Sequence, residues 1–455
     1  MSRALVQTLM RELSLNEKIL RHSALMRSLL GEPGGSNDAR GSNHAGIDSS
    51  IELFASVAWS AITEPGDEFA GYVRRQIGVA KSLSLLINCD DPRQWAFKLL
   101  DDDLANVADE RFVSFEQTIQ ESLARWRPRL SLAKVVALLD VAERLRLVLI
   151  NSRHSAWPSQ LSRLELAEPA MLWLRGSTAA LDASARSAAL VGSRTASTYG
   201  FEATTFLVQG LADAGVAIIS GGAFGIDAIA HRAALAVETP TVAVMAGGVD
   251  RLYPRSNEIL LSAIIEHGAV VSELAPGTAP TKWRFLQRNR IIAALSSATV
   301  VVEAGYRSGA INTANHANAL NLSVGAVPGS IFSATSAGCH RLLSDGKAQV
   351  VTSAAEVLDL IRSNSGDGTF DETSEPLANS SPKNSGFATE LLGPASVSAL
   401  LPLDIRVYDA IGFGRLTLDE ICLSAGLTSN EAMQALGSLT LLGLVSSADA
   451  RWARA

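Results

Sequence analysis

The chain has 455 residues, enough for about two to four domains, and its 47% hydrophobic and 19% charged residues are an ordinary globular balance. A formal net charge of -7 excludes a protein that is basic all over, although it leaves room for a local basic groove. Three separated cysteines exclude a CxxC zinc site and favour a reducing, cytoplasmic setting. No apolar run approaches a membrane span, and we expect neither a metal nor a cofactor.

The first 150 residues are predicted to be mainly helical. Residues 1–30 show helical spacing of leucines, whereas residues 31–50 are rich in Gly, Ser and Asn and are predicted to form a flexible linker. Residues 51–150 carry the apolar stripes of amphipathic helices. We therefore expect an N-terminal helix and linker over 1–50 and a helical domain over 51–150.

Residues 151–362 are predicted to form an α/β domain. From about residue 186, short β-rich runs alternate with amphipathic stretches, and the runs are apolar on both faces, as buried parallel strands are. The runs cover residues 188–191, 216–219, 242–245, 270–271, 300–302 and 324–327. This pattern predicts an extended Rossmann-like, doubly wound and mostly parallel sheet, which binds its ligand beyond the carboxyl ends of the strands.

Two further segments complete the chain. Residues 363–399 are rich in Ser, Asn, Gly, Pro and acids and are predicted to be a disordered linker. Residues 400–455 show the outline of three helices and a short hairpin, which predicts a winged-helix-like domain. This domain has six acidic residues and four arginines, and such a charge balance disfavours binding to duplex DNA. We therefore expect it to bind protein or to modulate the main domain.

The loop after the first of these strands offers the parts of a phosphate site. Gly192, Ser193 and Arg194 supply a glycine turn, amides at a helix start and a guanidinium. A tight turn with a structural ion pair of Arg194 would explain the same residues equally well. A dinucleotide fold would need G-x-G-x-x-G here and an acid at the end of the next strand, and the absence of both disfavours a nicotinamide enzyme.

The second loop also suits an anion. Ser220, Gly221 and Gly222 allow close approach of a ligand to the backbone at the start of a helix. Asp227 and His231 follow four residues apart on one helical face. They would form either a catalytic acid/base pair or, as we favour, a capping aspartate bonded to a histidine that fixes the loop.

The third element is a cationic run over residues 282–290. It contains four cations with two aromatic residues between them, a combination typical of proteins that bind single strands. Most charged runs, however, are simply solvated faces of a helix. Helical spacing places Arg288 on the crevice side, while Arg290 points elsewhere and suits a structural role. The candidate contacts are Lys282, Phe285, Arg288, Asn289 and Arg290.

The fourth loop follows the strand that ends at Glu303. Ser308 and Gly309 open the next helix with small and hydroxyl residues, and we expect Glu303 to orient Arg194 or Arg288. Four such loops on one sheet edge predict a convergent anion site.

Taken together, these motifs resemble those of the DprA/Smf family. The resemblance rests on LVGSRTASTYG (190–200), ISGGAFGIDAIAHRAAL (219–235), MAGGVDRLYPRSNEIL (245–260), SELAPGTAPTKWRFLQRNRIIAALS (272–296), VVEAGYRSGAINTANHA (301–317) and AVPGSIFSATSAGCHRLL (326–343). It covers about residues 157–362. His340 departs from the family pattern, as does Gly346-Lys347, which leaves local contacts there in doubt.

The resemblance implies a non-enzymatic protein that binds single-stranded DNA in a positive pocket and dimerises through the Rossmann-like domain. It also implies that the protein protects incoming DNA and loads the RecA recombinase on it during natural transformation and recombination. The implied DNA contacts are Arg194, the loop 220–222, Phe285, Arg288, Asn289 and Arg290, and Lys282 is less secure because its loop varies in the family.

Two other functions remain open. A nucleotide phosphoribohydrolase uses a similar scaffold but needs P-G-G-x-G-T-x-x-E at a strand end, where this chain has Glu303-Ala-Gly-Tyr-Arg-Ser-Gly instead. An RNA-binding or regulatory module would be distinguished by comparing DNA and RNA oligomers of one sequence.

Overall fold

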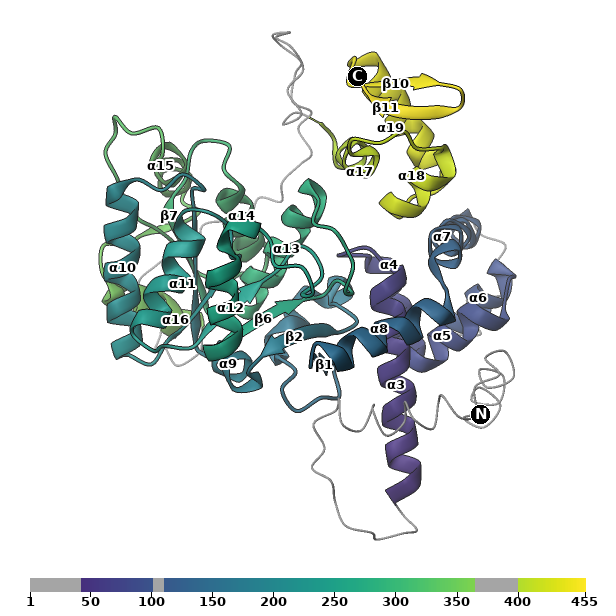
Figure 1. The fold of residues 1–455 in the computed structure, drawn as a ribbon, viewed down its shortest axis with the longest axis horizontal. Helices are drawn as coiled ribbons and strands as arrows, with labels where there is room; N and C mark the ends of the chain where they lie inside the picture. Colours follow the sequence, from purple (N-terminus) through teal and green to yellow (C-terminus); the bar gives the residue numbers. More distant parts are fainter. Residues whose placement is uncertain (1–41, 101–109, 365–399) are drawn as a thin grey trace.

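The computed structural model describes residues 42–100, 110–364 and 400–455, and it has a helical part, an α/β part and a C-terminal unit (Figure 1). The predicted helix over 1–30 lies outside the described residues, and so does nearly all of the predicted linker over 363–399. No helix within the described ranges is long and apolar enough to cross a membrane.

The described helical part begins earlier than expected. Its helices are α3 (Ser42–Ile62), α4 (Glu68–Ile77), α5 (Val79–Asn88), α6 (Pro92–Leu99), α7 (Glu110–Trp126) and α8 (Leu132–Arg144). The linker predicted over 31–50 is therefore wrong from Ser42 onward. The physical reason is packing: Leu53, Val57 and Trp59 are fully buried, and this anchored half of α3 stabilises the helix against an unfavourable composition.

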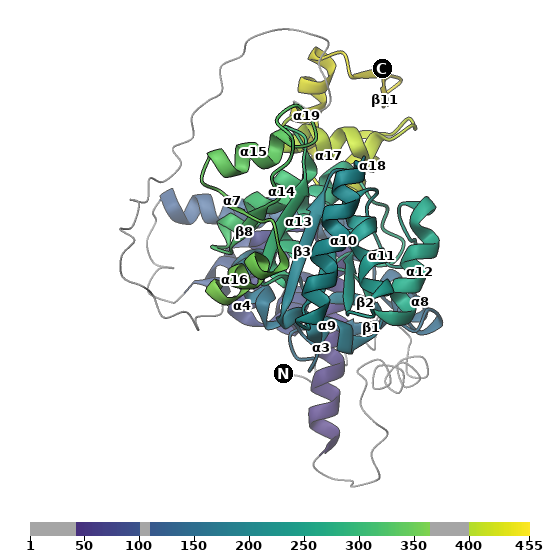
Figure 2. The same cartoon turned by 90° about the vertical axis from the view of Figure 1, so that its left-hand side faces the viewer.

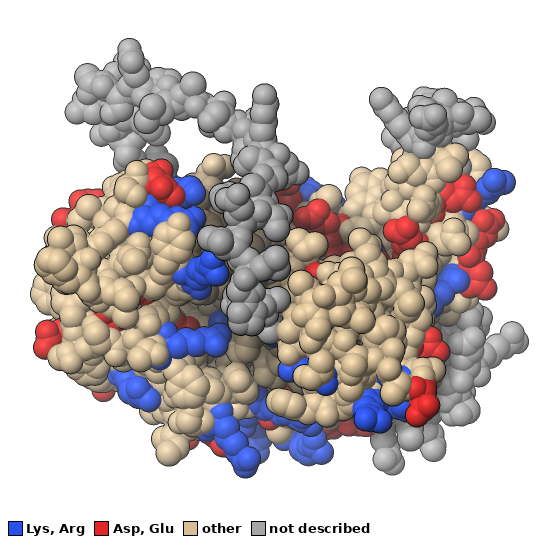
Figure 3. All heavy atoms as spheres, turned by 90° about the horizontal axis from the view of Figure 1, so that it is seen from above, with Lys and Arg blue, Asp and Glu red and all other residues tan. Residues whose placement is uncertain are grey.

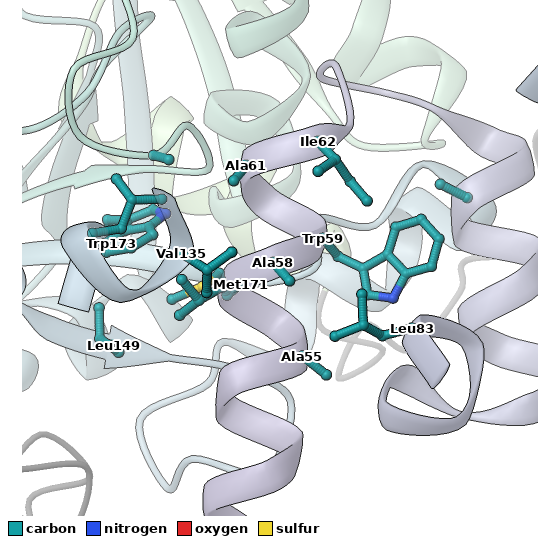
Figure 4. Close-up of a cluster of buried hydrophobic side chains, with 14 of the residues drawn as sticks. Ala55, Ala58, Trp59, Ala61, Ile62, Leu83, Val135, Leu149, Met171 and Trp173 are labelled. Atoms are coloured by element: carbon teal, nitrogen blue, oxygen red, sulfur yellow. The ribbon is translucent and has the colours of Figure 1, made fainter. Parts of the chain in front are cut away.

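The helical part and the sheet share one hydrophobic core. Trp59 packs edge-on against Trp126 with ring centroids 5.1 Å apart. On the other side of α3, Val135, Met171 and Trp173 fill the space between this helix and the sheet edge (Figure 4). The boundary expected at residue 150 thus crosses a continuous core, and residues 148–150 are already a strand of the sheet.

The sheet of the α/β part has nine strands in the order β1-β2-β6-β5-β4-β3-β7-β8-β9. The strands are β1 (Val148–Ile150), β2 (Leu172–Gly176), β3 (Ser187–Gly192), β4 (Ala217–Ser220), β5 (Thr241–Val244), β6 (Ala269–Ser272), β7 (Ala298–Glu303), β8 (Val324–Ala326) and β9 (Gln349–Val350). All pairs from β6 to β9 are parallel, whereas β2 is antiparallel to both of its neighbours. The six predicted runs are confirmed, while β1, β2 and β9 were not predicted.

Helices cover both faces of the sheet (Figures 1 and 2). One layer contains α10 (Thr198–Asp213), α11 (Ile226–Ala236), α12 (Glu258–His267) and α16 (Ala354–Asn364), and the other contains α13 (Lys282–Leu295), α14 (Gly309–Ala319) and α15 (Ala337–Ser344). Short helices α9 (Thr178–Asp182), η1 (Arg127–Arg129), η2 (Ser159–Ala167), η3 (Ala183–Ala185) and η4 (Arg255–Asn257) lie in the connections. Because the strand order reverses between β3 and β7, a crevice is expected at their carboxyl ends.

The C-terminal unit has a hydrophobic core of its own. It contains α17 (Pro402–Ile411), α18 (Leu418–Ala425), α19 (Ser429–Leu441), β10 (Val445–Ala448) and β11 (Arg451–Arg454). Thr417 and Thr428 begin the last two helices with capping boxes to Glu420 and Glu431. Three helices followed by a hairpin is the predicted element order, and the interpretation as a winged helix stays a prediction.

Candidate functional site

The loop after β3 is held in place by its backbone and leaves its arginine exposed. Ser193 donates its amide to Glu303 O at 2.7 Å and accepts at its own carbonyl from the amide of Ile226 at 3.1 Å. Arg194 is exposed, and its guanidinium lies over the ring of Phe285 at 5.3 Å from the centroid. The glycine turn therefore presents a cation and an aromatic ring together at the switch point.

Glu303 fixes the start of α10. The prediction that it orients Arg194 or Arg288 is wrong. Its carboxylate accepts from the Ser197 amide at 3.0 Å and from the Ser197 hydroxyl at 2.5 Å, and Thr335 donates a third bond at 3.0 Å. A side chain at Gly200 would overlap this carboxylate, which explains the glycine there. The physical reason is that Glu303 is only 2% exposed and that its carboxylate oxygens accept hydrogen bonds from hydroxyl and amide donors.

The loop after β4 closes over Arg288. This guanidinium donates to Gly221 O at 2.8 Å and to Val244 O at 2.5 Å, and its side chain is 6% exposed. A methyl group at Gly221 would overlap the guanidinium. Ser220 and Gly222 are also buried, with the Ser220 hydroxyl donating to Leu190 O at 2.7 Å. Arg288 thus reaches the predicted crevice side, but it supports the loop from behind and does not face solvent.

Asp227 and His231 do not pair with each other. Asp227 accepts from the Gly221 amide at 3.2 Å, so it does fix the loop, and burial raises the pKa of its carboxyl although nearby Arg288 opposes this. His231 lies in the core with Nδ1 2.8 Å from the hydroxyl of Thr241. The two residues lie one turn apart on α11, but Asp227 contacts Gly221 whereas His231 contacts Thr241.

The tautomer of His231 follows from its partner. The Thr241 hydroxyl donates to Ile218 O at 3.0 Å and therefore accepts from Nδ1–H of His231. Its Nε2 is buried and finds no hydrogen-bond partner among the described residues. Burial, with a smaller contribution from Arg288, lowers the pKa of this histidine to about 3, which keeps the ring neutral.

The cationic run on α13 divides between the surface and the interior. Lys282 is exposed and Phe285 is partly exposed, whereas Arg288, Asn289 and Arg290 are buried. Asn289 donates to Asn312 Oδ1 at 3.0 Å and bridges to α14. Three of the five candidate contacts are therefore buried in the structure, and their contact with DNA stays a prediction.

Arg290 is a structural residue, in line with its expected direction. It is 4% exposed and forms an ion pair with Glu273. Its Nε and Nη1 have no hydrogen-bond partner among the described residues. The neighbouring Arg284, also buried, donates to Glu64 at 2.8 and 3.1 Å, so the interior arginines hold α13 against the helical part.

The predicted residues after β7 open α14 as expected. Ser308 is the N-cap, and its hydroxyl accepts from the Ala310 amide at 3.3 Å. Gly309 is exposed, and its carbonyl accepts from Asn289 at 3.3 Å. The loop therefore borders the same edge as Arg194, although no direct contact joins the two.

Sequence reasoning missed the loop after β5. Tyr253 is 47% exposed and its ring centroid lies 5.7 Å from that of Phe285. Asn257 donates to Gly222 O at 3.1 Å and ties this loop to the loop after β4. The signal was present in the sequence R-L-Y-P-R, where the exposed Arg251 and Arg255 flank the tyrosine.

The exposed members form a cationic and aromatic surface. Figure 3 shows groups of Lys and Arg side chains across the α/β part, viewed from above. We call six exposed or partly exposed residues after β3, β5 and β6 the exposed set: Arg194, Arg251, Tyr253, Arg255, Lys282 and Phe285. The described residues contain no cluster of His, Cys, Asp and Glu that would hold a metal.

Comparisons with known proteins agree with these motifs. The family model described as DNA recombination-mediator protein A matches residues 148–362. A DNA processing protein DprA of Mycobacterium tuberculosis is 43% identical over 285 residues, covering 62% of this chain and 68% of that protein. Protein Smf of Escherichia coli is 41% identical over 172 residues, covering 38% of this chain and 46% of that protein.

A solved structure is similar over most of its length. The X-ray structure of DNA processing protein A from Streptococcus pneumoniae has a TM-score of 0.50 and 29% sequence identity, covering 68% of this chain and 97% of that chain. The long motifs, the doubly wound sheet and the extent of the M. tuberculosis match point to one conclusion. This chain belongs to the DprA/Smf family of DNA processing proteins.

Proposed function

We propose that the chain binds single-stranded DNA along the exposed set beyond the carboxyl ends of β3, β5 and β6. The observation that carries this proposal is the grouping of Arg194, Tyr253 and Phe285. The Arg194 guanidinium lies over the Phe285 ring at 5.3 Å from its centroid, and the Tyr253 ring lies 5.7 Å from that centroid at a tilt of 52°. Aromatic faces stack on unpaired bases and cations neutralise phosphates, which together favour single strands over duplexes.

The buried polar residues preorganise this surface. Arg288 holds Gly221 O and also lies 5.6 Å from the centroid of Phe285, on which Arg194 already stacks. Asp227 holds the amide of the same glycine from the other direction. A surface whose loops are fixed before binding loses less conformational freedom when DNA binds. We therefore assign Arg288 and Asp227 as positioning residues.

A binding role fits the carboxylates better than a catalytic one. Glu303 accepts three hydrogen bonds from Ser197 and Thr335, and Asp227 is buried beneath its loop. Neither is presented to a substrate as a general acid or base must be. We expect no release of base from nucleoside monophosphates, and turnover that disappears in Glu303→Gln would instead support the phosphoribohydrolase alternative.

The deciding experiment is fluorescence anisotropy with labelled single strand, its duplex and the RNA of the same sequence, over a salt series. The expected result is tightest binding to single-stranded DNA with an affinity that falls steeply as salt rises. Equal affinity for RNA would support the RNA-binding alternative, and no binding at low salt would overturn the proposal.

Two partners follow from the family and are proposals for this chain. We infer that it forms a homodimer through the Rossmann-like domain and passes its DNA to the RecA recombinase during recombination. Sedimentation across a concentration series checks the dimer. The rate of RecA ATP hydrolysis on DNA that this chain has protected checks the second step, and a rate that only falls as protein is added would contradict loading.

A further inference from the structure

The C-terminal unit covers the start of α13, next to the exposed set. The carboxylate of Asp409 on α17 accepts from the backbone amide of Trp283 at 3.1 Å. The guanidinium of Arg406 lies over the ring of Trp283, 5.6 Å from its centroid. Trp283 neighbours Lys282 and precedes Phe285 by two residues, so the unit occupies one end of the proposed DNA surface.

The contacts that α17 makes there are the contacts a nucleotide would make. An anion at a helix N-terminus is stabilised by free amides and by the helix dipole, and Asp409 supplies that anion. The face of an indole stacks on a base or on a guanidinium, and Arg406 takes that place. Residues of this chain thus fill both a phosphate-like and a base-like position.

Charged groups also meet elsewhere at this interface. Glu431 on α19 pairs with Arg125 on α7 at 3.3 Å. Within the C-terminal unit, the carbonyls of Ala425 and Gly426 accept from Arg406 at 2.6 and 2.9 Å and hold its side chain in place. A cavity of about 290 Å³ separates the two parts and is lined by Trp126, Arg129, Trp283, Arg406 and Gly426, among others. The Nε1 of Trp283 is buried without a hydrogen-bond partner in the described ranges.

Such an interface is suited to separation. Interfaces between the domains of one chain are more polar than permanent ones, and relative motion is expected unless they are large and apolar. The C-terminal unit has its own core around Val407, Ile421 and Leu436, so its fold does not depend on this contact. Undocking would expose Trp283 and satisfy its indole N–H with water.

We propose that the C-terminal unit competes with single-stranded DNA for the start of α13 and so restrains binding until it is displaced. This inference rests on the proposed function, because it assigns a regulation to the same surface. The docked unit closes the end at Lys282 and Trp283 but leaves Arg194, Tyr253 and Phe285 accessible, so DNA would engage the open end first.

The test uses the full chain with two charge-matched variants. Asp409→Lys removes the carboxylate from the Trp283 amide and places a cation near the positive end of the helix dipole. Asp419→Lys makes the same change of charge at an exposed position on α18 and is the control for general electrostatic attraction of DNA. Affinity for a labelled single strand is measured by anisotropy, and exchange of the α17 amides by hydrogen–deuterium exchange.

The expected result is an affinity about three- to tenfold higher for Asp409→Lys than for Asp419→Lys, because apparent affinity scales with the open fraction. DNA should also speed the exchange of the α17 amides in the unmodified chain, because binding displaces this helix from the start of α13. Equal affinities together with α17 exchange that DNA leaves unchanged would overturn the competition while leaving DNA binding intact. Absence of DNA binding by the unmodified chain and both variants would instead overturn the proposed function.

Discussion

The arginines around α13 fall into two groups with different roles, one exposed and one buried. The exposed set includes Arg194 and the two arginines on either side of Tyr253, and it faces solvent beyond the carboxyl ends of the strands. The buried group is paired: Arg284 and Arg129 with Glu64, Arg290 with Glu273, and Arg288 with backbone carbonyls. A high density of cations along the sequence therefore locates a site, but it does not indicate which of those cations contact the ligand.

The difference follows from desolvation. A guanidinium that is removed from water must recover its hydrogen bonds inside the protein, and each buried arginine here is placed beside a carboxylate or carbonyl. An exposed guanidinium keeps its water until a phosphate replaces it. Substitutions in the buried group should therefore alter stability first, and those in the exposed set should alter binding first.

The largest effect is expected at Glu64, whose carboxylate joins α13 to the helical part. Glu64→Ala would leave Arg284 and Arg129 buried without their shared partner, at a cost of about 3–5 kcal/mol in the free energy of unfolding. Urea denaturation measures it. The control is Asp359→Ala, which removes an exposed pair with Arg362 and should cost about 0–1 kcal/mol. Equal costs would mean that the buried network contributes no more than a surface pair.

The pH dependence of the free energy of unfolding tests the same buried network in a second way. Burial alone would raise the pKa of Glu64, but the guanidiniums of Arg284 and Arg129 hold it at about 2. A carboxyl with a depressed folded pKa stabilises the fold above its ordinary value of 4.5, and this contribution is lost as the pH falls from there toward 2. Glu64→Gln should therefore be least stable relative to the unmodified chain at neutral pH, with the gap closing below pH 4.5.

His231 should give the next largest effect, in a higher pH window. Its folded pKa of about 3 lies below the ordinary 6.5, so the unfolded chain gains a proton first as the pH falls. Between pH 6.5 and 4.5 this histidine should cost about 2 kcal/mol of stability. His231→Asn keeps a donor toward Thr241 and should flatten that slope, as thermal unfolding at several pH values would show. An unchanged slope would mean that His231 is protonated in the folded chain.

The sequence predicted the architecture well because apolar runs carry it. The six strands from β3 to β8 are buried on both faces, and their apolar runs can be recognised in the sequence without knowledge of their partners. By contrast, β9 is a two-residue exposed edge strand, and β1 pairs only through three residues of β2. Such edges depend on neighbours distant in the sequence.

The site was predicted less completely, for a related reason. Glycine loops and the cations of α13 were identified by local pattern, but the partners of those cations were not. Glu64 lies 220 residues from Arg284, and nothing local to either residue indicates that they pair. Tyr253 was missed although two arginines flank it, because its value as a stacking surface appears only when Phe285 is found 5.7 Å away.

Within the exposed set, the largest binding effect is expected at Tyr253. Tyr253→Ala removes one half of the aromatic pair and should weaken single-strand binding by about 1–3 kcal/mol, with little change in salt dependence. Tyr253→Phe retains the ring and should bind nearly as well as the unmodified chain. Anisotropy titrations of both variants measure this, and equal losses would point to the hydroxyl instead of stacking.

The smallest expected effect, and the most specific, is at Arg194. Arg194→Ala should lower the slope of log affinity against log salt by about 0.7, the loss of one phosphate contact on a single strand. Stability should barely change, because the side chain is exposed. Arg362→Ala, an exposed arginine on α16, removes the same charge far from the switch point and should leave the slope unaltered.

Arg288→Ala completes the contrast with Arg194. Since its guanidinium holds Gly221 O and Val244 O, its removal should lower the unfolding temperature and weaken binding through a loosened loop. The salt slope should then stay near that of the unmodified chain, because no phosphate contact is lost. A slope reduced as far as in Arg194→Ala, without loss of stability, would show that Arg288 emerges to bind DNA and that the two groups of arginines are not separate in the complex.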